Sequence, residues 1–219
     1  MQFREFSDEL DFYKYCVQKI KEVSETKIRA HNEFRIVLTG GETARLVYAE
    51  LRELKTDWSK WFFYFGDERC VPETDPDSNY FLAEKSLFEY IPVSKSQIFR
   101  IQGELGAENG AIEYSKLINS VASFDLVLLG LGEDGHVASL FPGQNLSDPK
   151  GILAISNSPK PPMERISLSI DRINSSDFVL IIAKGKKKTV IIDRIKSGEV
   201  LPATSLAPRK SLELCYYLN

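Results

Sequence analysis

The chain has 219 residues, of which 43% are hydrophobic and 27% are charged, and its formal net charge at pH 7 is −3. This length predicts one domain, residues 1–219, with a substantial core. The slightly acidic balance argues against a nucleic-acid partner, because no overall basic field attracts phosphates. No apolar run suits a signal peptide or a membrane helix, and the three cysteines lack metal-ligand spacing. We therefore expect a cytoplasmic protein with no membrane partner.

Helix and strand patterns alternate along the chain. Periodicity predicts helices over residues 8–26, with Ser7 as the N-cap, and over 43–54, 78–88, 107–121 and 186–195. Apolar runs predict strands at 34–38, 61–65, 98–101, 124–129, 152–155, 165–170 and 178–183. Strands that alternate with helices indicate βαβ units. The predicted fold is α/β: a mainly parallel sheet with helices on both faces, in a Rossmann-like three-layer sandwich.

Residues 124–136, FDLVLLGLGEDGH, are the most informative segment. They indicate a buried strand that runs into a glycine-rich turn carrying Asp134 and His136. If the turn stays extended, alternate side chains point the same way, so both groups would enter one pocket. A lone histidine in a turn is more often structural than catalytic. The glycines and the strand end favour function, because open α/β sheets bind ligands at the carboxyl ends of their strands.

Two further segments follow predicted strands. In the segment LTGGETA, Gly40 and Gly41 let backbone amides approach an anion at the start of a helix, although a tight turn would need the same residues. In DERCVP, Arg69 offers a planar fork that suits phosphate or carboxylate, although a surface Asp–Arg pair explains the segment at least as well. Either segment alone is a weak indication of a binding site.

Together these segments resemble the glucosamine-6-phosphate isomerase/6-phosphogluconolactonase family, and its lactonase branch in particular. The matching pieces run in family order over nearly the whole chain. They are LTGG at 38–41, DERCVP at 67–72 with Asp75 and 78–80, GLGEDGHVASLFPG at 130–143, SPKPP at 158–162 with 165–168, Gly185 with Lys188, and 201–203. The block around the histidine is highly specific, and the Asp-Glu-Arg block is nearly so.

The resemblance implies an α/β fold and hydrolysis of a phosphorylated sugar δ-lactone to its acid, in the oxidative pentose phosphate pathway. It implies no metal and no organic cofactor. A lactone needs an activated water, and a histidine can accept its proton at neutral pH. His136 is therefore the expected general base, and Asp134 is expected to orient the imidazole.

The resemblance also assigns substrate-binding roles. Gly40, Gly41, Arg69 and Lys188 would hold the substrate phosphate, with Arg165 as a further candidate and Thr39 as a hydroxyl donor. Asp67 and Asn79 would position loops or substrate hydroxyls, or would cap the following backbone. The alternative for Lys188 is a solvated lysine, because Lys184, Lys186 and Lys187 crowd the same stretch.

One segment departs from the family pattern. The family's phosphate loop usually reads Gly-Gly-Ser-Thr-Pro, whereas Glu42 and Ala44 stand here in place of the serine and the proline. A carboxylate that faced inward would repel a phosphate. We therefore expect Glu42 to face solvent.

Two rival functions remain at this stage. In the deaminase and isomerase branch, a further catalytic glutamate follows the histidine by five residues, where this chain has Phe141. A sugar-phosphate-sensing module without catalysis is the other rival, but such regulators carry a DNA-binding domain for which residues before 34 leave no room. The expected partner is a small phosphosugar lactone, and the expected assembly is a monomer or a small homo-oligomer.

Overall fold

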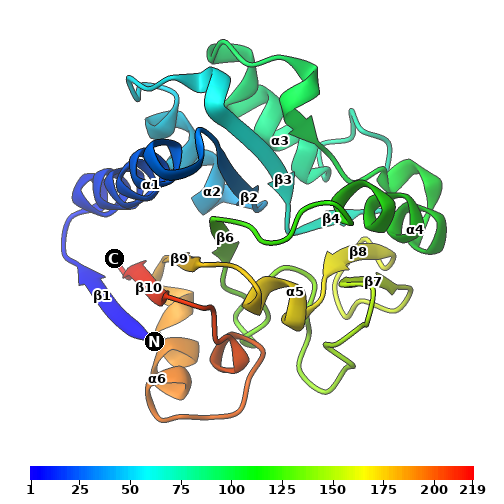
Figure 1. The fold of residues 1–219 in the computed structure, drawn as a ribbon. Coiled ribbons are helices and arrows are strands. Elements are labelled where there is room, and N and C mark those ends of the chain that lie inside the picture. Colours follow the sequence, from blue (N-terminus) through cyan, green and yellow to red (C-terminus); the bar gives the residue numbers. More distant parts are fainter.

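The computed structural model describes all residues 1–219, and a seven-stranded sheet forms its centre (Figure 1). The strand order is β1 (Gln2–Phe6), β10 (Ser211–Tyr217), β9 (Phe178–Lys184), β6 (Leu126–Gly130), β2 (Phe34–Leu38), β3 (Trp61–Phe65) and β5 (Ile98–Phe99). All neighbouring strands are parallel. The predicted α/β architecture is confirmed, although β1 and β10 were not predicted.

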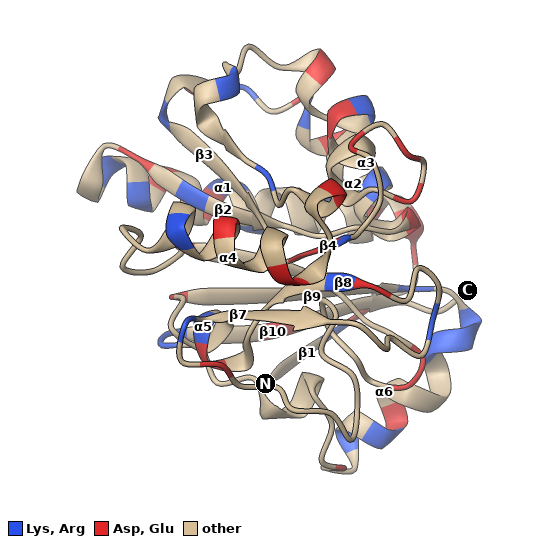
Figure 2. Cartoon of the chain, turned by 90° about the vertical axis from the view of Figure 1, so that its right-hand side faces the viewer, with Lys and Arg blue, Asp and Glu red and all other residues tan.

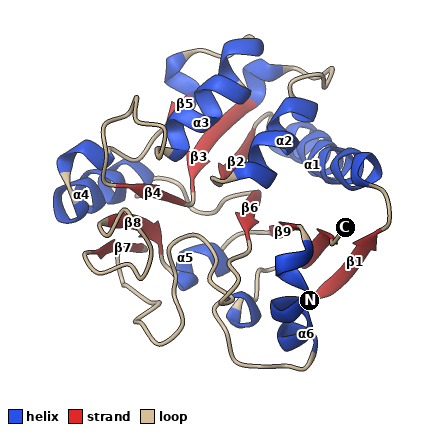
Figure 3. Cartoon of the chain, turned by 180° about the vertical axis from the view of Figure 1, so that it is seen from behind, coloured by secondary structure: helices blue, strands red, loops and turns tan.

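Helices cover both faces of this sheet (Figures 1 and 3). One side carries α1 (Glu9–His31), α2 (Glu42–Leu51) and α3 (Asn79–Ser86), and the other carries α4 (Ala107–Ile118), α5 (Ile170–Asn174) and α6 (Thr189–Lys196). Right-handed crossovers explain the two groups, because the chain moves one way across the sheet from β1 through β2 and β3 to β5, and the opposite way from β5 through β6 and β9 to β10. The direction reverses between the neighbouring strands β2 and β6. Such a switch point is where open α/β sheets bind ligands.

A second, smaller sheet lies beside the first. It is antiparallel, in the order β4 (Asp67–Arg69), β8 (Arg165–Leu168) and β7 (Ile152–Ile155). The predicted strand 165–170 ends at Leu168. The next residue, Ser169, caps α5, because its side chain accepts a hydrogen bond from the Arg172 amide. In this sheet Arg69 pairs directly with Arg165, so two separate motifs of the sequence meet.

The first helix differs most from its predicted bounds. Asp8, not Ser7, is the N-cap, because its carboxylate accepts a hydrogen bond from the Asp11 amide at 3.0 Å. The helix also continues past residue 26 to His31. Lys27 explains this extension, since its buried ammonium lies 2.8 Å from Asp125 and 2.5 Å from Asp177. These carboxylates lie at the amino ends of β6 and β9, so a distant contact fixes the last turns of α1.

The central strands are buried on both faces, which is why β2 and β6 are almost continuously apolar. Aromatic side chains fill much of this core, and the rings of Phe34 and Trp61 meet edge to face at 4.7 Å. Acidic and basic residues are distributed over the helices and loops (Figure 2). No helix combines the length and the apolarity needed to cross a membrane.

Candidate active site

A cleft of about 210 Å³ opens at the switch point, at the carboxyl ends of β2 and β6. Nine of the ten predicted site residues line it: Thr39, Gly40, Gly41, Asp67, Arg69, Asn79, His136, Arg165 and Lys188. The tenth, Asp134, contacts His136. The structure therefore brings together five segments that are far apart in the sequence. The chemical role of each residue stays a prediction.

Asp134 and His136 meet, but not through an extended chain. The Gly132 amide donates to the His136 carbonyl at 2.8 Å, and the Gly135 amide donates to the Gly132 carbonyl at 3.1 Å. The segment is thus a tight turn, and Gly135 adopts φ 89°, which favours glycine. The turn folds the Asp134 carboxylate back, so that its Oδ1 lies 2.5 Å from the imidazole Nδ1. With Nδ1–H donating to the carboxylate, Nε2 keeps its lone pair.

Burial sets the proton affinity of this imidazole. The His136 ring packs against the ring of Phe141, with centroids 4.7 Å apart, and burial lowers the pKa of His136 below its ordinary 6.5. The Asp134 carboxylate opposes this shift, and the Lys160 ammonium reinforces it. Although burial disfavours its charge, the pKa of Asp134 is also lowered, because His136 and its hydrogen bonds favour the carboxylate. The pair therefore consists of a neutral imidazole and a carboxylate at neutral pH.

This pKa predicts the acid limb of the activity profile. If His136 is the general base, as the sequence predicts, only its neutral imidazole can accept a proton, so kcat/KM should fall as the pH drops through the His136 pKa, with a midpoint below 6.5. Initial rates measured from about pH 5 to 8, with spontaneous lactone hydrolysis subtracted, test this. A midpoint above 6.5 would contradict the lowered pKa.

The Gly40–Gly41 loop presents the backbone at the start of α2. Gly41 is the N-cap with φ 91°, and no side chain caps the first amides of the helix. A Cβ on Gly40 would lie 1.8 Å from Oδ1 of the buried Asn79, so any other residue there would displace the Asn79 side chain. Glu42 is exposed and forms an ion pair with Arg45, which confirms that it faces solvent. The free amides and the helix dipole suit an anion.

Three cations among the predicted residues approach this cleft in different ways. Arg69 uses Nη1 to bond the Asp77 carbonyl at 2.7 Å. Lys188 donates from Nζ to the Leu131 carbonyl at 2.6 Å, and burial lowers its pKa. Arg165 is almost fully buried and donates to three carbonyls of residues 160–162. Most of the Arg165 donors are therefore occupied by its own loop.

Asp67 links the two most specific motifs. Its Oδ2 accepts a hydrogen bond from Ser139 Oγ at 2.6 Å, and its Oδ1 accepts one from Asn79 Nδ2 at 3.0 Å. Thr39 makes a similar link, because its Oγ1 accepts from the Gly130 amide at 3.3 Å and so joins β2 to β6. Asp67, Asn79 and Thr39 thus hold the walls of the cleft in place.

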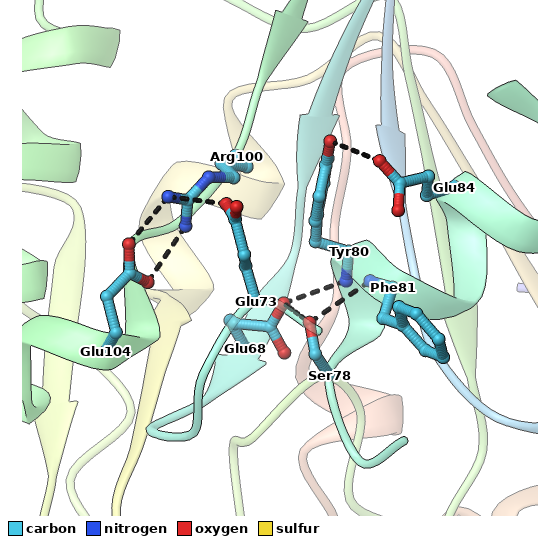
Figure 4. A network of polar contacts seen from close by, with 8 residues as sticks. All are labelled: Glu68, Glu73, Ser78, Tyr80, Phe81, Glu84, Arg100 and Glu104. Carbon is cyan, nitrogen blue, oxygen red and sulfur yellow. Dashed lines mark hydrogen bonds and ion pairs between the residues drawn. The ribbon is translucent and has the colours of Figure 1, made fainter. Parts of the chain in front are cut away.

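The neighbouring Glu68 fixes the start of α3. Its buried carboxylate accepts hydrogen bonds from the backbone amides of Arg69, Asn79 and Tyr80 and from Ser78 Oγ, at 2.7–3.0 Å. Figure 4 shows this carboxylate beside Ser78 and Tyr80. In the same view Arg100 bridges Glu73 and Glu104, which ties down the loop between β4 and α3. Burial raises the pKa of Glu68, although these donors oppose the shift.

Sequence reasoning missed several residues of the cleft, chiefly Lys160 and Glu133. Lys160 belongs to the quoted segment SPKPP, so its motif was noticed but its side chain was not assigned. A charged residue between prolines is the signal that could have found it. The structure gathers no three His, Cys, Asp or Glu side chains that could hold a metal ion.

The fold and the cleft define a doubly wound α/β protein with a polar cleft at its switch point. A family model described as glucosamine-6-phosphate isomerases/6-phosphogluconolactonase matches residues 7–214. The chain is 34% identical over 223 residues to 6-phosphogluconolactonase 3, chloroplastic, of Arabidopsis thaliana, covering 90% of this chain and 67% of that protein. The chain therefore belongs to the glucosamine-6-phosphate isomerase/6-phosphogluconolactonase family.

Solved structures agree with this assignment. The crystal structure of 6-phosphogluconolactonase from Thermotoga maritima matches with a TM-score of 0.93 and 27% identity, over 100% of this chain and 99% of that chain. A monomeric glucosamine-6-phosphate deaminase also matches, with a TM-score of 0.87 and 20% identity, over 100% of this chain and 98% of that chain. The second likeness concerns the fold alone. The fold is therefore shared by both branches, and site residues must separate them.

Proposed function

We propose that the protein hydrolyses 6-phospho-D-glucono-1,5-lactone to 6-phosphogluconate, in the oxidative pentose phosphate pathway. The Asp134–His136 pair at the edge of a cationic cleft carries this proposal. The lactonase names of its relatives support it as well. The Gly40–Gly41 loop, Arg69 and Lys188 would hold the phosphate, and His136 would face the lactone.

The reaction follows from the arrangement of the pair. A water oxygen attacks the lactone carbonyl carbon while His136 Nε2 accepts one water proton, and the carbonyl π electrons move onto the carbonyl oxygen. Asp134 stabilises the imidazolium through Nδ1–H. When the oxyanion collapses, the bond between the carbonyl carbon and the ring oxygen breaks, and His136 returns the proton to that oxygen. The resulting carboxylic acid ionises in water. Because His136 and water make every proton transfer in these steps, the proposed mechanism needs no metal or organic cofactor.

Phe141 favours hydrolysis over the deaminase chemistry. It occupies the position of the further catalytic glutamate of the deaminase branch, is 1% exposed and packs on His136. An apolar ring cannot transfer a proton, but it lowers the local polarity around the base. A sensing module without catalysis remains the second rival, and turnover separates it from an enzyme.

The direct test is a rate assay on freshly generated 6-phosphogluconolactone in the presence of a chelator, with spontaneous hydrolysis subtracted. We expect enzyme-dependent hydrolysis, and no release of ammonia from glucosamine 6-phosphate. Binding of the lactone without turnover would instead support a sensor. Activity that disappears with the chelator and returns with added metal would contradict the metal-free mechanism.

Arg69 provides the test of the phosphate site. Arg69→Ala should reduce kcat/KM on the phosphorylated lactone by about 1.5–3 kcal/mol, or roughly 10- to 100-fold, through loss of a charge-assisted contact. The slow hydrolysis of unphosphorylated gluconolactone should change little. Arg209→Ala is the matched control, because Arg209 is exposed and lies near the amino ends of the strands. An equal loss of kcat/KM on both substrates would show that Arg69 acts at the reaction centre and not at the phosphate site.

We further propose that residues 1–219 act as a single cytoplasmic domain, without nucleic acid or membrane partners, as a monomer or a small homo-oligomer. The net charge of −3 supports the absence of a nucleic-acid partner. Sedimentation of the purified protein at several concentrations would measure the assembly. Cell fractionation would measure the location.

A further inference from the structure

Lys160 is a cation of the cleft whose charge acts on the proposed base. Its Nζ is 3.9 Å from Asp134 Oδ1, the same oxygen that contacts His136 Nδ1. The ammonium is thus separated from the imidazole by one carboxylate oxygen. Arg69 instead bonds the Asp77 carbonyl, and Lys188 bonds the Leu131 carbonyl. Lys160 has no such backbone partner for its ammonium, and its side chain remains about half exposed.

The loop that carries Lys160 is firmly built. Arg165 donates to the Lys160, Pro161 and Pro162 carbonyls at 3.0–3.1 Å. From the other side, the fully buried Ser158 donates from Oγ to the Lys160 carbonyl at 2.9 Å, and accepts from the Lys160 amide at 3.3 Å. The backbone of Lys160 is therefore fixed by buried side chains, while its ammonium is left to the cleft. An ordinary surface lysine has no comparable support.

We propose, on the basis of the proposed lactonase function, that Lys160 is a second catalytic residue: its ammonium contacts the lactone carbonyl oxygen and stabilises the oxyanion that forms there. When water adds, its oxygen forms a bond to the carbonyl carbon, and the π electrons move to the oxygen held by Lys160. The proton goes to His136, so Lys160 neither gains nor loses one. The Asp134 carboxylate positions both catalytic groups, because it contacts the Lys160 ammonium and the His136 imidazole.

The electrostatic surroundings of His136 agree with this placement. Three charged groups act on its imidazole: Asp134 from the same turn, Asp67 from β4 and Lys160 from the loop held by Arg165. Both carboxylates raise the pKa of His136, and Lys160 lowers it. A cation at this position therefore favours the hydrolysis in two ways. It offers charge to the oxyanion, and it keeps the base in its neutral form.

Two substrates and two variants test the proposal. Lys160→Met should lower kcat by about 10²- to 10³-fold, the usual effect of removing one oxyanion donor, with a much smaller change in KM. The loss should be equal on phosphorylated and unphosphorylated gluconolactone, unlike the loss expected for Arg69→Ala. Lys160→Arg should restore part of kcat, since it keeps the charge. Lys150→Met is the matched control, because Lys150 is exposed and lies outside the cleft.

Titration of the imidazoles by NMR gives a readout that does not need turnover. The chain has only two histidines, so His136 can be followed beside His31 as an internal reference. The His136 pKa should rise in Lys160→Met and stay unchanged in Lys150→Met. Unchanged kcat in Lys160→Met, a loss confined to the phosphorylated substrate, or an unmoved His136 pKa would each overturn the proposal. A wild-type protein that hydrolyses neither lactone would refute the lactonase function itself, while the titration would still test the position of Lys160.

Discussion

His136→Gln is expected to lower kcat on the phosphorylated lactone by about 10²- to 10⁴-fold, which is the usual contribution of a general acid–base residue. Glutamine keeps a polar side chain of similar length, but it cannot accept a proton from water. KM should change little, because the phosphate contacts come from other segments. Steady-state kinetics on the purified variant measures both constants.

His31→Gln is the matched control for this prediction. His31 is the only other histidine, and it is exposed at the end of α1, away from the cleft. Its replacement should leave kcat and KM unchanged. Thermal unfolding should show that both variants remain folded. A folded His136→Gln protein with wild-type kcat would remove His136 from the mechanism.

Gly132→Ala is expected to be nearly as damaging, although it removes no functional group. A Cβ at this position would lie 2.0 Å from His136 Nδ1 and 2.6 Å from Asp134 Oδ1. Real Cβ atoms do not approach so closely, so the imidazole and the carboxylate must move from their observed positions. We expect kcat to fall by at least about 10²-fold, because positioning errors of this size cost as much as losing a catalytic group.

The control for this change is Gly66→Ala. Gly66 also follows a central strand, but an added Cβ there meets its nearest atom at 3.5 Å, an ordinary contact. Its activity should stay close to wild type. In Gly132→Ala, the NMR titration of His136 should also change, because the imidazole and the Asp134 carboxylate are both displaced by the added Cβ. Unchanged activity in Gly132→Ala would show that the observed Asp134–His136 contact is not required.

The order of helices and strands was predictable because local apolar patterns carry it. β10 was missed for a physical reason: Glu213 interrupts its apolar run in the sequence. In the structure this buried carboxylate contacts Arg4 at 3.0 Å, Tyr15 at 2.6 Å and Lys19 at 3.5 Å. These partners come from β1 and α1. No local pattern shows that such distant groups will neutralise the charge.

The site was predictable only in part. Each motif follows a strand, and parallel strands end at one edge, so Arg69, Gly40 and His136 were expected to converge. The meeting of Asp134 and His136 was predicted from an extended chain, whereas a tight turn produces it. Lys160 was missed because its position depends on hydrogen bonds from Arg165, which the sequence does not reveal.

The switch point between β2 and β6 has a consequence for substrate choice. The proposed phosphate loop follows β2 and the proposed base follows β6, and these neighbouring strands are joined in a fixed register. Adjacent strands lie about 4.8 Å apart, and hydrogen bonds keep that spacing rigid. The sheet therefore fixes the distance between the proposed phosphate site and the proposed base, and so the distance between the phosphate and the carbonyl carbon of the ligand. Moving the phosphate to another carbon of the sugar would leave the carbonyl misplaced beneath His136, even with every contact residue intact.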